Sequence, residues 1–177
     1  MDRTEYEKIA EENLDMVYRI ALSHTGKEAD ADDVVQQTFY KLLASPGKFA
    51  DEEHVKRWLI RVCINECNSM FSGFWRKNVQ MFSQMASREE KAEYDPGQAL
   101  SGGEYGQEDP VFAQQEKREL LEALGNLPPV LRSVLYLFYY EGYKTREIAQ
   151  ILHVREATVR TRLVRGRKLL REELKEA

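Results

Sequence analysis

A break in the pattern of apolar residues divides this 177-residue chain into two parts. Between about Met85 and Pro110 lies EYDPGQALSGGEYGQEDP, which holds four glycines, two prolines and few aliphatic residues. Such a composition predicts a flexible linker. On both sides of it, apolar residues recur at helical spacing, and no alternating strand pattern is visible. We therefore expect an all-α protein of two small helical domains, residues 1–78 and 114–177, joined by a flexible linker over residues 79–113.

Three helices are expected in the first domain. The first ends at Gly26, the second covers about residues 29–44, and the third covers about residues 53–71. A loop over residues 45–54 separates the second from the third. The side chains predicted to point inward are, helix by helix, Ile9, Ala10, Leu14, Val17, Tyr18 and Ala21; Ala31, Val34, Val35, Thr38, Phe39, Leu42 and Leu43; and Val55, Trp58, Leu59, Val62, Cys63 and Met70.

Charge is distributed unevenly along the chain. Residues 1–75 carry nine basic and fourteen acidic side chains. Residues 76–115 carry four basic and seven acidic side chains, and residues 116–177 carry thirteen basic and nine acidic ones. The net charges of −5, −3 and +4 add up to the −4 of the whole chain. Between Arg155 and Arg171, seven basic residues stand against one acid, Glu156. This asymmetry suggests that the two domains have different partners.

Four helices are expected in the second domain, over about residues 114–124, 128–141, 145–153 and 154–174. Thr145 is predicted to cap the third of them. The last two form a helix-turn-helix pattern, because two short amphipathic runs are separated by a tight turn near His153. The apolar positions of this motif are Ile148, Ala149, Leu152, Val154, Val159 and Leu163.

The helix after the turn has one apolar and one cationic side at 100° per residue. Its apolar stripe consists of Val159, Leu163, Gly166 and Leu170. Its exposed face consists of Arg160, Thr161, Val164, Arg165 and Lys168, flanked by Arg162, Arg167 and Arg171. Such side chains can read base edges in the major groove or hold phosphates, which favours DNA binding. A solvated cationic face is the alternative.

The sequence gives little support for an enzyme. Asp30, Asp32 and Asp33 could suggest a metal site, but acids in the first turn of a helix also favour its dipole, which is the preferred interpretation. Cys63 and Cys67 are one turn apart and are expected to pack in the core, not to form a disulfide or a zinc site. No nucleophile–base pair or glycine-rich phosphate loop is visible. We expect no enzymatic activity, metal or cofactor.

The start of the chain, MDRTEYEKIAEENLD, lacks the apolar core of a signal peptide. No run approaches the roughly 18 apolar residues that cross a bilayer. We therefore expect a soluble, cytoplasmic protein without membrane insertion of its own.

Two blocks of the sequence, in this order, resemble bacterial RNA polymerase sigma factors. DADDVVQQTFYKLL, then a loop with Phe49, then VKRWLIRVCINECN, resembles their conserved region 2, a bundle of three or four helices. LGNLPPVLRSVLYLFYYEGYKTREIAQILHVREATVRTRLVRGRKLLREEL resembles their region 4. The short two-domain plan is similar to the extracytoplasmic-function (ECF) group. The resemblance covers about residues 5–77 and 114–175. One departure is His153, which replaces the glycine usual at this often left-handed turn.

The resemblance implies an alternative sigma factor that binds core polymerase and directs promoter-specific initiation. The residues implied in docking on the clamp helices of the largest core subunit are Asp33, Gln36, Gln37, Tyr40 and Lys41. Those implied at the −10 element, partly single-stranded, are Phe49 and His54 in the base-capturing loop and Arg57, Arg61, Asn65 and Asn68 on the next helix. Those implied at the −35 duplex are Arg160, Thr161, Val164 and Arg165, with DNA-backbone contacts near Arg155, Arg162 and Lys168.

Further implications concern the surroundings of these sites. Arg76 and Lys77 would extend the −10 surface, and Trp58 is interpreted first as a core residue and second as a melting wedge. The acidic linker would lie in the active-site and RNA-exit channel of the polymerase. An anti-sigma factor is implied as a further partner.

Two other function classes stay open at this point. A stand-alone helix-turn-helix regulator that does not bind core polymerase would explain the second domain, but it leaves residues 1–75 without a role. A metal-dependent hydrolase built on Asp30–Asp33 would lack a credible ligand set.

Overall fold

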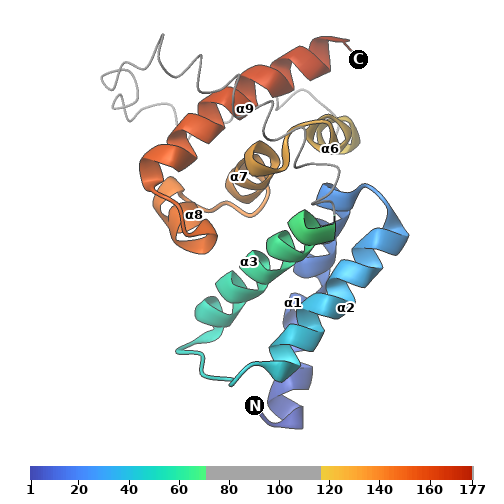
Figure 1. Ribbon diagram of the computed structural model, residues 1–177, viewed down its shortest axis with the longest axis vertical. Coiled ribbons are helices and arrows are strands. Elements are labelled where there is room, and N and C mark those ends of the chain that lie inside the picture. Colours follow the sequence, from blue (N-terminus) through green and yellow to red (C-terminus); the bar gives the residue numbers. More distant parts are fainter. Residues whose placement is uncertain (71–116, 177) are drawn as a thin grey trace.

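The computed structural model describes residues 1–70 and 117–176, and within these two ranges it contains seven helices and no strand. The expected all-α fold is therefore confirmed for this part of the chain. The helices are α1 (Arg3–Thr25), α2 (Glu28–Ala44), α3 (Glu52–Met70), α6 (Lys117–Gly125), α7 (Pro129–Tyr139), α8 (Thr145–Leu152) and α9 (Glu156–Glu176) (Figure 1). The predicted linker, Arg76 and Lys77 lie outside the described residues.

Helices α1, α2 and α3 pack against one another as an N-terminal bundle (Figure 1). Helix α1 begins where the Asp2 carboxylate accepts a hydrogen bond from Glu5 N at 2.8 Å. It ends at Gly26, whose φ of 70° is left-handed, a conformation that glycine adopts without steric cost. The predicted end of this helix is thereby confirmed. The fully buried side chains that hold the bundle together include Val17, Ile20, Ala31, Leu42, Leu59, Ile60 and Cys63.

Three side chains expected to point inward are instead on the surface. Leu14 is 47% exposed, Leu43 is 58% exposed and Met70 is 41% exposed. In α1 and α2 the neighbours Asn13 and Leu42, 100° away around each helix, take the buried positions. Asn13 tolerates burial because its Nδ2 donates a hydrogen bond to Ile9 O at 2.8 Å. In α3 two positions missed from the sequence, Ile60 and Ile64, are buried.

Helices α6 to α9 form a C-terminal bundle in which α9 lies across α7 and α8 (Figure 1). The predicted inner stripe of α9 is confirmed, because Val159, Leu163, Gly166 and Leu170 are all buried. Gly166 permits the close crossing of α9 and α7. A Cβ at this position would lie 2.8 Å from Leu135 Cδ1, well inside van der Waals contact.

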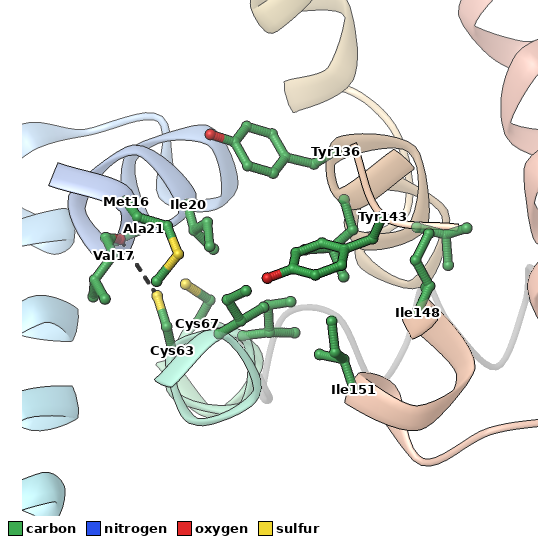
Figure 2. Close-up of a cluster of buried hydrophobic side chains, with 14 of the residues drawn as sticks. Met16, Val17, Ile20, Ala21, Cys63, Cys67, Tyr136, Tyr143, Ile148 and Ile151 are labelled. Carbon is green, nitrogen blue, oxygen red and sulfur yellow. Dashed lines mark hydrogen bonds between the residues drawn. The ribbon is translucent and has the colours of Figure 1, made fainter. Parts of the chain in front are cut away.

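The two bundles are in contact, and their buried side chains form one continuous cluster (Figure 2). Tyr136 of α7 and Tyr143 of the α7–α8 loop reach toward α1 and α3, and Ile151 of α8 also lines this interface (Figure 2). Polar contacts join the same surfaces. His24 Nε2 lies 2.9 Å from Ser133 Oγ, and Arg132 donates to His24 O at 2.5 Å.

Arg132 is a buried cation that binds carbonyl groups at the ends of two helices. Besides His24 O at the end of α1, its guanidinium donates to Leu124 O at 2.9 Å and to Gly125 O and Leu127 O at 2.7 Å. A cation is favourable at these positions because helix C-termini carry partial negative charge. Burial lowers the pKa of Arg132 to about 10.

None of the described helices is both long and apolar enough to span a membrane.

Candidate nucleic-acid interface

The helix-turn-helix consists of α8, a tight turn and α9. Residue His153 ends α8 with φ 54° and ψ 45°, a left-handed conformation. The chain then turns so that Val154 N donates to Ala149 O at 3.1 Å, and α9 begins at Glu156. Ile148 and Val159 are fully buried where the two helices meet. The left-handed turn expected at His153 is present, and the residue that occupies it is not glycine.

The start of α8 differs from the prediction that Thr145 caps it. The cap position is Lys144, whose backbone N donates to the Glu147 carboxylate at 2.9 Å. Thr145 instead donates its hydroxyl hydrogen to Glu156 at 2.7 Å, and Arg160 donates to the same carboxylate oxygen at 2.8 Å. Glu156 thus ties α8 to the first turns of α9. The Thr145 hydrogen bond, together with the charge of Arg160, holds the pKa of Glu156 below its usual value.

The surface of α9 that faces away from the bundle carries most of the predicted −35 residues. Arg155, Val164 and Lys168 are exposed, and Arg160, Thr161, Arg162 and Arg165 are half-buried. Arg162 is partly desolvated, which lowers its pKa. A methyl-bearing Val164, 55% exposed, lies among cations and a hydroxyl. This mixture suits a groove in which guanidinium groups reach guanine and aliphatic groups reach thymine methyl groups.

Arg167, predicted as a flanking phosphate contact, is engaged within the bundle. Its Nε donates to the Tyr139 hydroxyl at 2.6 Å, and its guanidinium lies 5.6 Å from the ring centroids of Phe138 and Tyr139. It packs α9 against α7 in this structure.

An aromatic cluster joins the loop between α2 and α3 to the first turns of α3. The ring of Phe49 meets those of His54 and Trp58 edge to face, with centroids 5.5 and 5.6 Å apart. The loop is held by Ala50 N, which donates to His54 Nδ1 at 3.1 Å, and by His54 N, which donates to Asp51 at 2.7 Å. Trp58 is half-buried against the core, as its first interpretation requires. The structure therefore brings together the two residues predicted to stack on a flipped base.

The four polar residues predicted on the exposed side of α3 fall into two pairs. Asn65 and Asn68 are exposed. Arg57 and Arg61 are half-buried because they contact α8 of the other bundle. Arg57 donates to Glu53 on its own helix at 2.9 Å, and across the interface to Gln150 at 3.0 Å and Glu147 at 3.1 Å. Arg61 Nη1 lies 2.9 Å from His153 Nδ1.

The α8 residues in these contacts, Glu147, Gln150 and His153, were not identified as functional from the sequence. No pattern in the sequence pairs them with α3, because they lie about 90 residues from their partners. Their neighbour Tyr143 adds an aromatic contact, with its ring 5.7 Å from Lys56 Nζ and 6.0 Å from the Arg57 guanidinium. Burial raises the pKa of Tyr143 well above its usual value.

The outer face of α2 carries the predicted polymerase-binding residues. Asp33, Gln36, Gln37 and Lys41 are exposed, and Tyr40 is 65% exposed. Lys41 forms an ion pair with Glu66 of α3. Asp30, Asp32 and Asp33 do not assemble with other ligands, since no group of three potential metal-binding side chains occurs in residues 1–70 and 117–176.

Both cysteines are free and buried, as predicted. The Cys63 thiol donates to Val17 O at 3.6 Å. The adjacent Cys67 side chain and burial hold the pKa of Cys63 well above its usual value, which makes this thiol unreactive.

Comparisons with known proteins match both bundles. The model of Sigma-70 region 2 matches residues 9–77, and that of Sigma-70 region 4 matches residues 117–170. The ECF RNA polymerase sigma factor SigL of Mycobacterium tuberculosis is 30% identical over 169 residues, which cover 93% of this chain and 87% of that protein. SigE of Mycolicibacterium smegmatis is 29% identical over 174 residues, 96% of this chain and 61% of that longer protein.

A solved structure has the same fold. The sigma factor RpoE of Bartonella quintana, crystallised in complex with the anti-sigma factor NepR, superposes with a TM-score of 0.66 at 20% identity and covers 97% of both chains. The two family models, in this order and over both bundles, together with the full-length similarity to SigL, identify the family. This chain belongs to the ECF group of RNA polymerase sigma factors, the factors that direct polymerase to promoters.

Proposed function

We propose that this chain recognises the two promoter elements with separate bundles, while the outer face of α2 binds core polymerase. The observation that carries the proposal is the cationic outer face of α9 above a complete helix-turn-helix, in a chain whose N-terminal part is acidic. The proposed domains are residues 1–78 and 114–177, with a linker over residues 79–113.

At the −35 element, α9 enters the major groove. Arg160, Thr161, Val164 and Arg165 contact base edges, and Arg155, Arg162 and Lys168 hold phosphates. Support comes from the helical geometry, because the buried stripe of α9 leaves the opposite side available. Glu156 supports the assignment of Arg160 by fixing that side chain near the start of the helix.

At the −10 element, the loop before α3 and the first turn of α3 capture an unpaired base, which stacks on Phe49 and His54. The edge-to-face pair already provides aromatic surface at one place, and each stacked base contributes about 1–3 kcal/mol in such sites. Arg57, Arg61, Asn65 and Asn68 continue along α3 and contact the strand. The half-buried Trp58 supports the Phe49 ring by an edge-to-face contact.

The α2 face of Asp33, Gln36, Gln37, Tyr40 and Lys41 docks on the clamp helices of the largest polymerase subunit. Its support is the exposed Tyr40 among polar side chains, since exposed aromatic groups on polar faces are typical anchors of protein interfaces. The net charge of −5 over residues 1–75 also repels free DNA. Tight promoter binding then depends on the polymerase.

The partners follow from this role. Core polymerase and promoter DNA are required, and the chain acts in the cytoplasm, without catalysis of its own. The relative from Bartonella quintana was crystallised with an anti-sigma factor, which supports an inhibitor protein of the same class for this chain.

Run-off transcription tests the role directly. The purified chain is mixed with bacterial core polymerase and a library of promoters with randomised −35 and −10 positions, and the transcripts are sequenced. Transcripts with a common start site and a shared pair of elements are expected. DNA binding without any transcript would instead favour the stand-alone regulator, which gives the N-terminal bundle no role.

A further inference from the structure

Glu156 is the one acid between Arg155 and Arg171, and it lies in the first turn of the helix proposed to enter the major groove. A single carboxylate oxygen, Oε1, accepts two hydrogen bonds there. One comes from the Thr145 hydroxyl at 2.7 Å and the other from Arg160 Nη2 at 2.8 Å. Helix α8 thus fixes the carboxylate, and the carboxylate fixes Arg160. We call Thr145, Glu156 and Arg160 the triad.

The triad is half-buried, so water competes only in part for its contacts. The side chains of Glu156 and Arg160 are 35% and 34% exposed. The hydrogen bond from Thr145, followed by the charges of Arg160 and Arg146, lowers the pKa of Glu156 and keeps its carboxylate charged. An ordinary i,i+4 ion pair is held by its two members alone. Here a residue eleven positions away, on another helix, holds the carboxylate as well.

This arrangement leaves most of the Arg160 guanidinium available to DNA. An arginine has five N–H donors in a planar fork, and the ion pair with Glu156 uses one of them. Two neighbouring donors are enough for a bidentate contact with O6 and N7 of guanine. A flexible arginine gives up rotamer freedom when it docks on a base. Because Glu156 restricts that freedom before DNA arrives, less of it is lost on binding.

The same carboxylate opposes the general attraction between α9 and DNA. A negative charge close to the phosphates raises the free energy of every complex, whatever its sequence. Glu156 is therefore expected to lower the affinity for all sequences while it raises the preference for the sequence that Arg160 reads.

We infer that Glu156 is a positioning residue for −35 recognition: held by Thr145, it orients Arg160 toward one base pair and increases discrimination there, while it lowers the affinity for DNA of any sequence. The inference rests on the proposed −35 role of Arg160. A merely structural tie between α8 and α9 would behave differently, because a distorted helix-turn-helix weakens the contacts at all −35 positions together.

Substitutions within the triad separate these functions. Glu156→Gln keeps the shape of the side chain and removes its charge. Thr145→Val keeps the shape and removes the hydroxyl group that holds the carboxylate, and Thr145→Ser restores that group. Arg160→Ala identifies the base pair that Arg160 reads. Glu122→Gln on α6 is the matched control for charge, since it changes an exposed i,i+4 pair with Arg118.

Competition fluorescence anisotropy measures binding by the full chain assembled with bacterial core polymerase. The competitors are duplex promoter fragments with each −35 base pair substituted in turn, and one fragment with a shuffled −35 element. Discrimination is the ratio of the affinities for the original and the substituted fragment.

At the base pair identified by Arg160→Ala, both Glu156→Gln and Thr145→Val are expected to reduce discrimination about threefold and to leave the other −35 positions unchanged. Glu156→Gln should also bind the shuffled fragment about twofold more tightly, because it removes a negative charge, whereas Thr145→Val should not. Thr145→Ser and Glu122→Gln are expected to match the unmodified chain.

The double variant of Glu156→Gln with Arg160→Ala provides the decisive comparison. If Glu156 acts through Arg160, the second substitution causes no further loss of discrimination. A further loss, or a loss at another base pair, would show that Glu156 contacts a base itself and would overturn the inference. Equal weakening at every −35 position would overturn it too, in favour of a structural tie.

Failure of the inference and failure of the proposed function give different results. If Arg160→Ala alters discrimination at no base pair, the proposed −35 role of Arg160 is wrong, and the inference fails with it. If Arg160→Ala alters discrimination and Glu156→Gln does not, only the inference fails.

Discussion

Acidification should destabilise this protein through one buried histidine. His24 is 5% exposed at the interface of the bundles, 2.9 Å from Ser133 and edge to face with Tyr136, beside the Arg132 guanidinium. Burial, reinforced by the positive charge of Arg132, lowers the pKa of His24 from 6.5 to about 4. Arg132 is the one charged group that contributes to this lowering, so the folded protein resists protonation at this position while the unfolded chain does not.

The sign and size of the effect follow from linkage. Above pH 6.5 His24 is neutral in both states, and its contribution to stability is complete. Between pH 6.5 and about 4 only the unfolded chain binds the proton, so the free energy of unfolding falls as the pH falls. At about 1.4 kcal/mol for each pH unit, the full loss is about 3 kcal/mol, of which about 2 kcal/mol is reached near pH 5. The whole free energy of unfolding of a typical domain is only about 5–15 kcal/mol, so this loss is a substantial part of it.

Urea unfolding followed by circular dichroism, from neutral pH down to about pH 4.5, measures this loss. Carboxylates also titrate in this range, so the decisive quantity is the difference between the unmodified chain and His24→Gln, which keeps hydrogen-bonding groups but does not titrate. We expect the unmodified chain to lose about 2 kcal/mol more than the variant by about pH 5. Parallel curves for the two proteins would refute the reasoning, because His24 would then titrate normally in the folded state.

Three further predictions concern the packing and the proposed contacts. Gly166→Ala should destabilise the chain by about 1–3 kcal/mol in urea unfolding, because the added Cβ meets Leu135 at 2.8 Å; an unchanged midpoint would show that α7 and α9 can move apart freely. Arg165→Ala should reduce the binding free energy by about 1–3 kcal/mol for discrimination at one base pair of the −35 element, measured with promoters substituted at each −35 position in turn. Equal weakening for every promoter sequence would instead identify a phosphate contact. Gln36→Ala with Tyr40→Ala should weaken binding to core polymerase in a pull-down titration and leave thermal stability unchanged, because both side chains are exposed; undiminished binding would remove α2 from the docking surface.

Elements with a strong local signal could be predicted from the sequence. The glycine that ends α1, the apolar stripe of α9 and the pairing of Phe49 with His54 are each indicated by residues within a few turns of chain. Helical periodicity identifies which side of a helix is apolar, but it does not resolve neighbours 100° apart. Periodicity therefore predicts Leu14 inside where Asn13 is buried instead, and it predicts both Leu42 and Leu43 inside where only Leu42 is buried.

Contacts between the bundles could not be predicted, because nothing local specifies them. Arg132 looks like an ordinary surface cation in the sequence, yet it is 3% exposed and binds carbonyl groups of two bundles. Arg57 and Arg61 are predicted on the exposed side of α3 but are half-buried against α8, because their partners lie about 90 positions away in the sequence. The role of His153 became visible only with its partner, since the sequence shows a missing glycine and no reason for it.

The hydrogen bonds of Arg132 are divided unequally between the two bundles. Of the carbonyl groups that it binds within the described residues, three lie between Leu124 and Leu127 in its own bundle, and one, His24 O, belongs to α1. If the bundles separate, water replaces the hydrogen bond from Arg132 to His24 O, and the three hydrogen bonds within the C-terminal bundle remain. Three of these hydrogen bonds therefore hold the Leu124–Leu127 segment against α7 independently of the contact with α1, so the local fold around Arg132 does not depend on the N-terminal bundle.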